Sequence, residues 1–208
     1  MMAYLDEFIL IALAHFFAVA SPGPDFAIIL KQSISYGRRN ALFASAGVGL
    51  GILVHVTYCL LGVALIIAQS ETLFNWLKYL AAAYLAYMAF QALQAKPANG
   101  EVQKMSTHLS DEPVSRSFSK GFLTNALNPK ATLFFLSLFT IVIDPNTPSL
   151  VQAGYGVYMA LATWVWFSFL SLILSKTQVR AFFLKSGHWF DRGIGIVLLI
   201  LAVRVVLL

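Results

Sequence analysis

Charged residues are scarce in this chain. Lys, Arg, Asp and Glu make up 11% of its 208 residues, whereas hydrophobic residues make up 59%. An ordinary soluble domain carries roughly 25% charged residues, and a soluble core of this size could not hide so much apolar surface. The composition therefore excludes a soluble globular protein and predicts a polytopic protein whose solvent is lipid.

Cysteine is nearly absent as well. Cys59 is the single cysteine, so no disulfide forms within the chain and the redox compartment is not indicated. The net charge of +5 predicts no nucleic-acid partner, because Lys and Arg in a membrane protein report its orientation first.

Basic residues are missing before the first apolar run. The small residues at Ala18–Ser21 imitate the cleavage site of a signal peptide, but a signal peptide also needs a basic n-region. This chain has only Asp6 and Glu7 there. We therefore expect the first apolar run to be retained as a membrane helix.

Long apolar runs, by contrast, are abundant, and six of them reach the roughly 20 residues that span a bilayer. They are Leu5–Leu30, Ala41–Ala68, Leu73–Leu93, Phe118–Ile143, Val151–Leu174 and Trp189–Leu208. The segment 96–117 is polar and contains two prolines and a glycine, as flexible linkers do. The sequence predicts an all-α integral membrane protein with three helices in 1–95, a polar linker at 96–117 and three helices in 118–208.

Basic residues gather on alternate connections between these runs. Eleven of the fourteen Lys and Arg lie in the first connection, the central linker region and the fifth connection. The N-terminus and the connections at Gln69–Thr72 and Asp144–Leu150 hold none. By the positive-inside rule the three basic connections are cytoplasmic. With six spans, both termini are then predicted to lie outside.

Proline motifs interrupt two of the predicted helices, at Ser21–Asp25 in the first run and at Asn125–Lys130 in the fourth. Proline lacks an amide donor and clashes with the preceding turn. An aspartate costs about 2.5–3.5 kcal/mol at the centre of a helix in lipid. Such a stretch persists at membrane depth only where it is buried in protein or lines a water-filled cavity.

The two interrupted helices occupy corresponding positions in the two halves. Three spans per half is an odd number, so the halves have opposite orientations. Broken helices at corresponding positions of inverted halves mark a transporter's binding site. We therefore predict two inverted three-helix repeats, with substrate bound near mid-membrane where the first and fourth helices are broken.

Two charged side chains are the leading candidates for this site. Asp25 is a candidate proton carrier or partner for a substrate ammonium, and its alternative role is an N-cap. Lys130 is a candidate ligand for a substrate carboxylate, and its alternatives are to pair with Asp25 or to satisfy the broken backbone. Whether the two groups pair is left open by the sequence.

The other candidate residues offer hydrogen bonds or backbone geometry. The asparagine amides suit a zwitterion or brace the break, and the unwound motifs offer carbonyls and helix N-termini to the substrate. The histidines are candidate proton relays or hydrogen-bonded packing residues, and the tyrosine lines the path or packs. These substrate-binding or coupling candidates are Ser21, Pro22, Gly23, Pro24, Asn125, Asn128, Pro129, Tyr84, His15 and His55.

Several short motifs occur along nearly the whole chain. After Ser21–Asp25 come Gly37-Arg38-Arg39-Asn40-Ala41, Ala83-Tyr84-Leu85-Ala86-Tyr87, Gly121-Phe122-Leu123-Thr124-Asn125, Asn128-Pro129-Lys130 and Asp191-Arg192-Gly193. In this order they resemble the LysE/RhtB family of small amino-acid exporters, and most of all its threonine and homoserine efflux branch.

The resemblance implies secondary efflux of small neutral or cationic amino acids across a bacterial plasma membrane, driven by the proton gradient. The implied partners are the amino acid, protons and the lipid bilayer, without a cofactor, a metal or nucleic acid; a homo-oligomer stays open. The alternative is a metal or inorganic cation exporter, which needs a cluster of carboxylate, His or Cys ligands. Only Asp25, His15 and His55 are at hand for that. An enzyme is not expected, because the sequence shows neither paired carboxylates nor a Ser–His arrangement.

Overall fold

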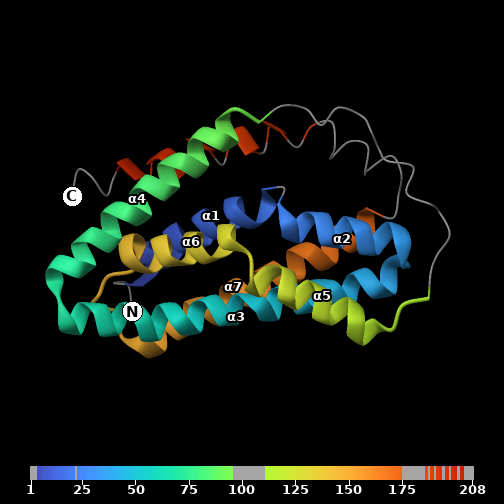
Figure 1. The fold of residues 1–208 in the computed structure, drawn as a ribbon, viewed down its shortest axis with the longest axis horizontal. Coiled ribbons are helices and arrows are strands. Elements are labelled where there is room, and N and C mark those ends of the chain that lie inside the picture. Colours follow the sequence, from blue (N-terminus) through green and yellow to red (C-terminus); the bar gives the residue numbers. More distant parts are fainter. Residues whose placement is uncertain are drawn as a thin grey trace.

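The structure is a computed structural model that describes residues 4–21, 23–95, 111–174 and parts of 186–203. Within these residues the chain folds into helices and turns (Figure 1). The elements are α1 (Leu5–Ala20), α2 (Pro24–Ser35), α3 (Gly37–Gln69), α4 (Glu71–Leu93), α5 (Val114–Ala126), α6 (Pro129–Ser137), the π-helical turn η2 (Leu138–Val142) and α7 (Ser149–Ile173). The described part of 186–203 runs beside α4, where a Cβ on Gly195 would meet Leu93 and Ala89.

The helices lie where the sequence predicts apolar spans. Residues Gly37–Gly62 of α3 and the whole of α7 are each long and apolar enough to cross a bilayer. The α1–α2 pair adds a third candidate span, bent by 52° at its break. The described residues thus confirm an all-helical fold with two or three candidate spans, which is consistent with a membrane protein. The six-span arrangement stays a prediction, and residues 96–110 of the predicted linker lie outside the described residues.

Both proline motifs interrupt their helices as predicted. Helix α1 ends at Ala20 and α2 begins at Pro24, whereas α5 ends at Ala126 and α6 begins at Pro129. Each proline occupies the first turn of its new helix, where the missing amide would have had no helical partner. Pro22 lies outside the described residues.

Helix α3 packs closely against α5 and α7. A Cβ on Gly47 would lie 2.7 Å from the backbone nitrogen of Phe122, and a Cβ on Gly121 would lie 2.8 Å from the carbonyl carbon of Ala44. On the α7 side, a Cβ on Gly49 would lie 2.8 Å from the Cβ of Trp164. Glycine at these positions lets the helix backbones touch, as in other membrane bundles.

Two buried apolar clusters lie on either side of the helix breaks. The larger includes Ile52 of α3 and Met159 of α7, and the smaller includes Val48 and Leu170 of the same two helices. Between them along α7 lies Thr163, a buried polar residue. The apolar clusters therefore leave a polar layer in the middle of the bundle, at the level of the breaks.

A polar clamp joins α3 to the start of α5. Asn40 Nδ2 donates to the Glu112 carbonyl and to Ser117 Oγ, each at 2.8 Å. Lys120 Nζ pairs with Glu112 Oε2 at 2.7 Å and lies 5.1 Å from the centre of the Tyr36 ring. Burial raises the pKa of the Glu112 carboxyl, but the hydrogen bond and charge of Lys120 outweigh it and hold that pKa below its ordinary value.

The close α3–α5 approach yields a first prediction. Gly121→Ala should lower the melting temperature of the detergent-solubilised protein, because the new Cβ collides with the backbone of Ala44; overpacking of this kind costs about 1–3 kcal/mol. Gly154→Ala is the matched control, since nothing lies within 4 Å of a Cβ there. A Gly121→Ala protein as stable as the Gly154→Ala protein would show that α3 and α5 do not touch in this way.

The clamp yields a second prediction, about pH. A carboxyl whose folded pKa is lowered stabilises the fold above its unfolded pKa, and the stabilisation is lost as the pH falls through the folded pKa. Glu112→Gln should therefore lower the melting temperature at pH 7, by the equivalent of about 0.5–1 kcal/mol. The gap to the wild type should close in acid. A gap that stays constant at every pH would assign the loss to something other than this charge.

Candidate functional site

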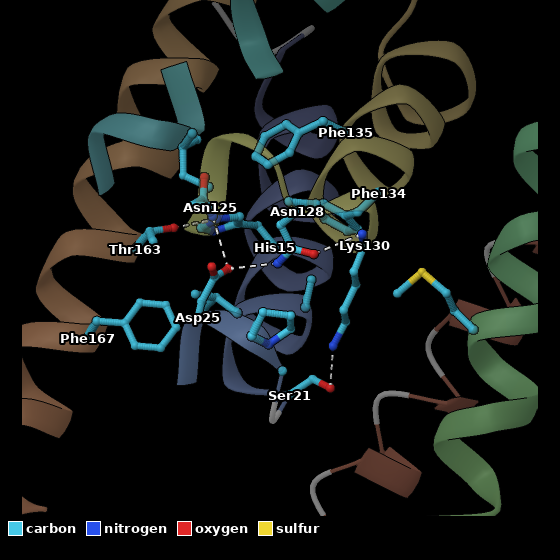
Figure 2. A pocket seen from close by; sticks show the side chains of 17 residues that line it. His15, Ser21, Asp25, Asn125, Asn128, Lys130, Phe134, Phe135, Thr163 and Phe167 are labelled. Atoms are coloured by element: carbon cyan, nitrogen blue, oxygen red, sulfur yellow. Dashed lines mark hydrogen bonds between the residues drawn. The ribbon is translucent and has the colours of Figure 1, made fainter. Parts of the chain in front are cut away.

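The two helix breaks meet around a cavity of about 50 Å³. Figure 2 shows side chains from α1, α2, α5, α6 and α7 converging on it. Its polar lining consists of His15, Ser21, Asp25, Asn125, Asn128, Lys130 and Thr163. The residues that the sequence predicts from two distant motifs thus lie in one place.

Asp25 stands in the first turn of α2, directly after the first break. Its Oδ2 accepts hydrogen bonds from Asn125 Nδ2 at 3.0 Å and from Asn128 Nδ2 at 3.3 Å. Its Oδ1 is buried and has no protein partner. A buried carboxylate oxygen without a partner is costly, so this atom is available to a proton or to a cationic group.

Lys130 reaches across the breaks in the other direction. Its Nζ donates to Ser21 Oγ at 2.8 Å, and Ser21 Oγ donates to Asp191 Oδ1 at 3.0 Å. No ion pair joins Lys130 to Asp25; within the described part of the chain the one ion pair is that of Lys120. The pairing that the sequence left open is therefore not made directly.

Asn128 links the two charged residues instead. Its Nδ2 donates to Asp25 Oδ2, and its Oδ1 accepts from the backbone amide of Lys130 at 3.0 Å. The second contact makes Asn128 the N-cap of α6. One amide therefore holds the carboxylate of the first break and caps the helix that resumes after the second break.

The two histidines occupy different positions relative to the cavity. His15 lines it, and its Nε2 lies 3.0 Å from Thr163 Oγ1. His55 lies behind it, with Nε2 at 2.9 Å from the Asn125 carbonyl and Nδ1 at 2.6 Å from Tyr58 Oη. A carbonyl only accepts, so His55 Nε2 carries a hydrogen, and a neutral ring then accepts from Tyr58 at Nδ1. His55 thus braces the end of α5 and does not line the cavity.

A second cavity, of about 340 Å³, adjoins the first. The residues that line both cavities are Ala18, Ser21, Gly23, Pro24, Met88 and Lys130, and most of the other residues around the second cavity belong to α4. Tyr84 faces this second cavity and is absent from the lining of the first. Pro129 is exposed and lines neither.

Sequence reasoning missed two polar members of the site, Thr163 and Asp191. Thr163 is a lone hydroxyl in an apolar run, which is a weak signal. Asp191 carried a stronger one, since it is an acidic residue at the start of the predicted sixth span and belongs to one of the short motifs. Among the described residues no three His, Cys, Asp or Glu side chains form a group that could hold a metal ion.

Comparison with known proteins identifies relatives of the whole chain. The chain is 28% identical to the threonine efflux protein of Salmonella typhi, over 88% of this chain and 89% of that protein. It is 27% identical to the threonine efflux protein of Escherichia coli, with the same coverage, and 31% identical to the leucine efflux protein of Klebsiella pneumoniae, over 75% of this chain and 73% of that protein. No solved structure matches significantly. The sequence model of the LysE type translocators matches residues 16–208, and the chain therefore belongs to the LysE type translocator family.

Proposed function

We propose that this chain exports small neutral amino acids from the bacterial cytoplasm, in exchange for protons, across the inner membrane. Its relatives named as threonine and leucine efflux proteins support amino-acid export. The observation that carries the proposal is the unpartnered Oδ1 of Asp25, in a cavity that Lys130 also lines.

The architecture that we propose for this transporter has six spans in two inverted three-helix repeats. Residues 1–95 and 118–208 form the repeats, 96–117 forms a cytoplasmic linker, and both termini lie outside. The meeting of the α1–α2 break with the α5–α6 break supports this arrangement, because inverted-repeat transporters bind substrate between such discontinuous helices.

Each charged group suits one end of an amino acid. The substrate ammonium would take the free oxygen of Asp25, while Asn125 and Asn128 hold the other oxygen in place. The substrate carboxylate would bind Lys130 at the start of α6, where the helix dipole also favours an anion. Recognition would therefore depend on the α-amino and α-carboxyl groups that all amino acids share.

Proton exchange would follow from the competition for Asp25. A buried carboxylate favours either a proton or a bound cation over standing alone. A proton entering from outside would therefore displace the substrate ammonium, and a substrate entering from the cytoplasm would displace the proton. This mutual exclusion converts one binding site into an exchanger.

The inner cavity is small for this task. Its volume of about 50 Å³ is far below the roughly 300 Å³ at which ligand pockets usually begin, and it leaves space for a few waters only. Figure 2 shows Phe134 and Phe135 on one side of Asp25 and Phe167 on the other. Substrate binding would require these aromatic side chains to separate, as rocking of one repeat against the other would achieve.

The proposed function is tested by counterflow in proteoliposomes. Vesicles loaded with unlabelled threonine, leucine or other amino acids should accumulate the labelled form, and a proton gradient should drive net movement. A panel without any amino-acid exchange would contradict the proposal. Exchange that ignores the proton gradient would retain amino-acid transport and remove the antiport.

Replacement of Asp25 gives a third prediction. Asp25→Asn keeps an oxygen that accepts from Asn125 and Asn128, but it cannot titrate. Transport driven by a proton gradient should fall at least about tenfold, since a protonatable group at the coupling site is lost. Asp6→Asn, on the exposed first turn of α1, is the matched control. Full proton-driven export by the Asp25→Asn protein would rule Asp25 out as the carrier.

Replacement of Lys130 gives a fourth prediction. Lys130→Gln keeps a donor for Ser21 but removes the charge that we assign to the substrate carboxylate. The KM for threonine in counterflow should rise about tenfold or more, as expected for a lost charged hydrogen bond. Lys31→Gln is the control, because Lys31 is exposed on α2 and lines neither cavity. An unchanged KM in the Lys130→Gln protein would separate Lys130 from carboxylate binding.

A further inference from the structure

We propose that the cavity of about 340 Å³ beside the helix breaks is a loading site for neutral α-amino acids, in which Asp191 binds the ammonium and Lys130 the carboxylate. The proposal rests on the function proposed above and adds a second substrate site to it. It also gives the amino acid a place to bind before the smaller cavity of about 50 Å³ opens to admit it.

The size and place of the larger cavity suit this role. Its volume of about 340 Å³ lies in the range of ordinary ligand pockets. It extends from Ser21 and Lys130 at the breaks to Gln91 and Ala95 at the C-terminal end of α4. That end leads into the linker that the basic residues predict to be cytoplasmic. An exporter takes up its substrate from that side.

The charges in the cavity suit an α-amino acid. Ser21 Oγ stands between Lys130 and Asp191, accepting from the lysine at 2.8 Å and donating to the aspartate at 3.0 Å. One hydroxyl therefore separates a cation from an anion. The ammonium and carboxylate of an α-amino acid are likewise separated by a single carbon. A bound amino acid would present its carboxylate to Lys130 and its ammonium to Asp191, with Ser21 beside both.

The remaining walls select against a charged side chain. Lys130 and Asp191 are the charged residues among the described lining. In the proposed complex, both are already bound to the α-carboxylate and the α-ammonium of the substrate. Met88, Ala92 and Leu198 offer apolar surface, and Tyr84 adds an aromatic ring. A cationic or acidic side chain would find no partner here and would lose its hydration. The cavity therefore fits neutral amino acids better than cationic ones.

Lys130 would stay bound to the substrate carboxylate while the substrate moves from the larger cavity to the smaller one. It lines both cavities, and its long side chain is anchored at a backbone amide held by Asn128. While the carboxylate stays on Lys130, the ammonium would exchange Asp191 for the free oxygen of Asp25. The two aspartates then act in sequence, one in loading and one in coupling, and neither needs a direct ion pair with Lys130.

Asp191→Asn tests the assignment in inside-out membrane vesicles, where threonine enters from the cytoplasmic face. Asparagine still accepts the hydrogen bond of Ser21 but carries no charge. The KM for threonine should rise at least about tenfold, with a maximal rate within about twofold of the wild type. Asp191→Glu should restore most of the affinity, and Asp111→Asn, at an exposed position, should change neither parameter. An unchanged KM, or a lost maximal rate at unchanged KM, would overturn the proposal.

A second measurement leaves Asp191 intact and reads occupancy of the cavity directly. Gln91 lines the cavity, whereas Gln94, exposed one turn later on the same helix end, does not. Cys59 is fully buried, so it need not be replaced before a thiol reagent is used. Saturating threonine or leucine should slow the labelling of Gln91→Cys at least about fivefold and leave that of Gln94→Cys unchanged, as expected for a site held mostly occupied.

N-Acetyl-threonine is the matched probe, because it lacks the ammonium and should give no protection. Equal protection at both positions, no protection at Gln91→Cys, or protection by N-acetyl-threonine would each overturn the loading site. Wild-type vesicles that exchange no amino acid would instead contradict the proposed function. A protein that exchanges threonine while Gln91→Cys stays unprotected has the proposed function without the loading site.

Discussion

The cost of placing a carboxylate inside an apolar helix bundle is the constraint on which the rest of this structure depends. Asp25 follows a break in one helix, and the donors that hold its Oδ2 come from the break of another helix about a hundred residues away. Neither break alone supplies these side-chain partners: Asp25 is bound by Asn125 and Asn128, and Lys130 is bound by Ser21. Each break supplies polar groups to the other inside the bundle, and burial in protein is the condition under which irregular backbone is tolerated in a bilayer.

The glycines of α3 serve this same constraint. A Cβ on Gly51 would lie 2.7 Å from Asn125 Oδ1 and 2.9 Å from Asn125 Cβ. A larger residue at position 51 would push the amide away from Asp25. His55, one turn further along α3, holds the carbonyl of the same asparagine and stacks on Phe135. The close packing of α3 therefore also fixes the geometry of the site, because Gly51 and His55 of α3 contact Asn125 at the second break.

The positions of both breaks could be predicted from the sequence, because proline and glycine act through local backbone geometry that needs no knowledge of the fold. Helical periodicity likewise aligns His55 with Gly47 and Gly51, and small residues at such spacing are typical of a helix face that packs inside a membrane bundle. The partner of Lys130 could not be predicted. A lysine side chain has several rotatable bonds, and its choice between Asp25 and Ser21 depends on how the two helix breaks are placed against each other.

Sequence separation explains the remaining omissions. Thr163 and Asp191 join the site from helices that carry no proline motif, and each contacts its partner across about 150 residues or more of chain. The neighbouring sequence does not distinguish Thr163 from a threonine whose hydroxyl bonds within its own helix. It also does not distinguish Asp191 from an acidic residue that merely lies at a helix end. Their contribution is visible only in the structure, where Thr163 of α7 contacts His15 of α1 and Asp191 contacts Ser21 at the end of α1.

The separation of Asp25 from Lys130 has a functional reason in the exchange that we propose. A direct ion pair would satisfy both groups, and a proton or a substrate would then have to break it before binding. Asn128 instead joins the Asp25 carboxylate to the backbone amide of Lys130 and leaves Asp25 Oδ1 unpaired. Lys130 is held by a neutral hydroxyl, from which it is released at a smaller cost than from a carboxylate. In the proposed exchange, an arriving zwitterion would therefore give each of these two residues a partner of opposite charge. A transporter needs such an arrangement, because binding must be favourable in the occupied states and no internal pair should compete with them.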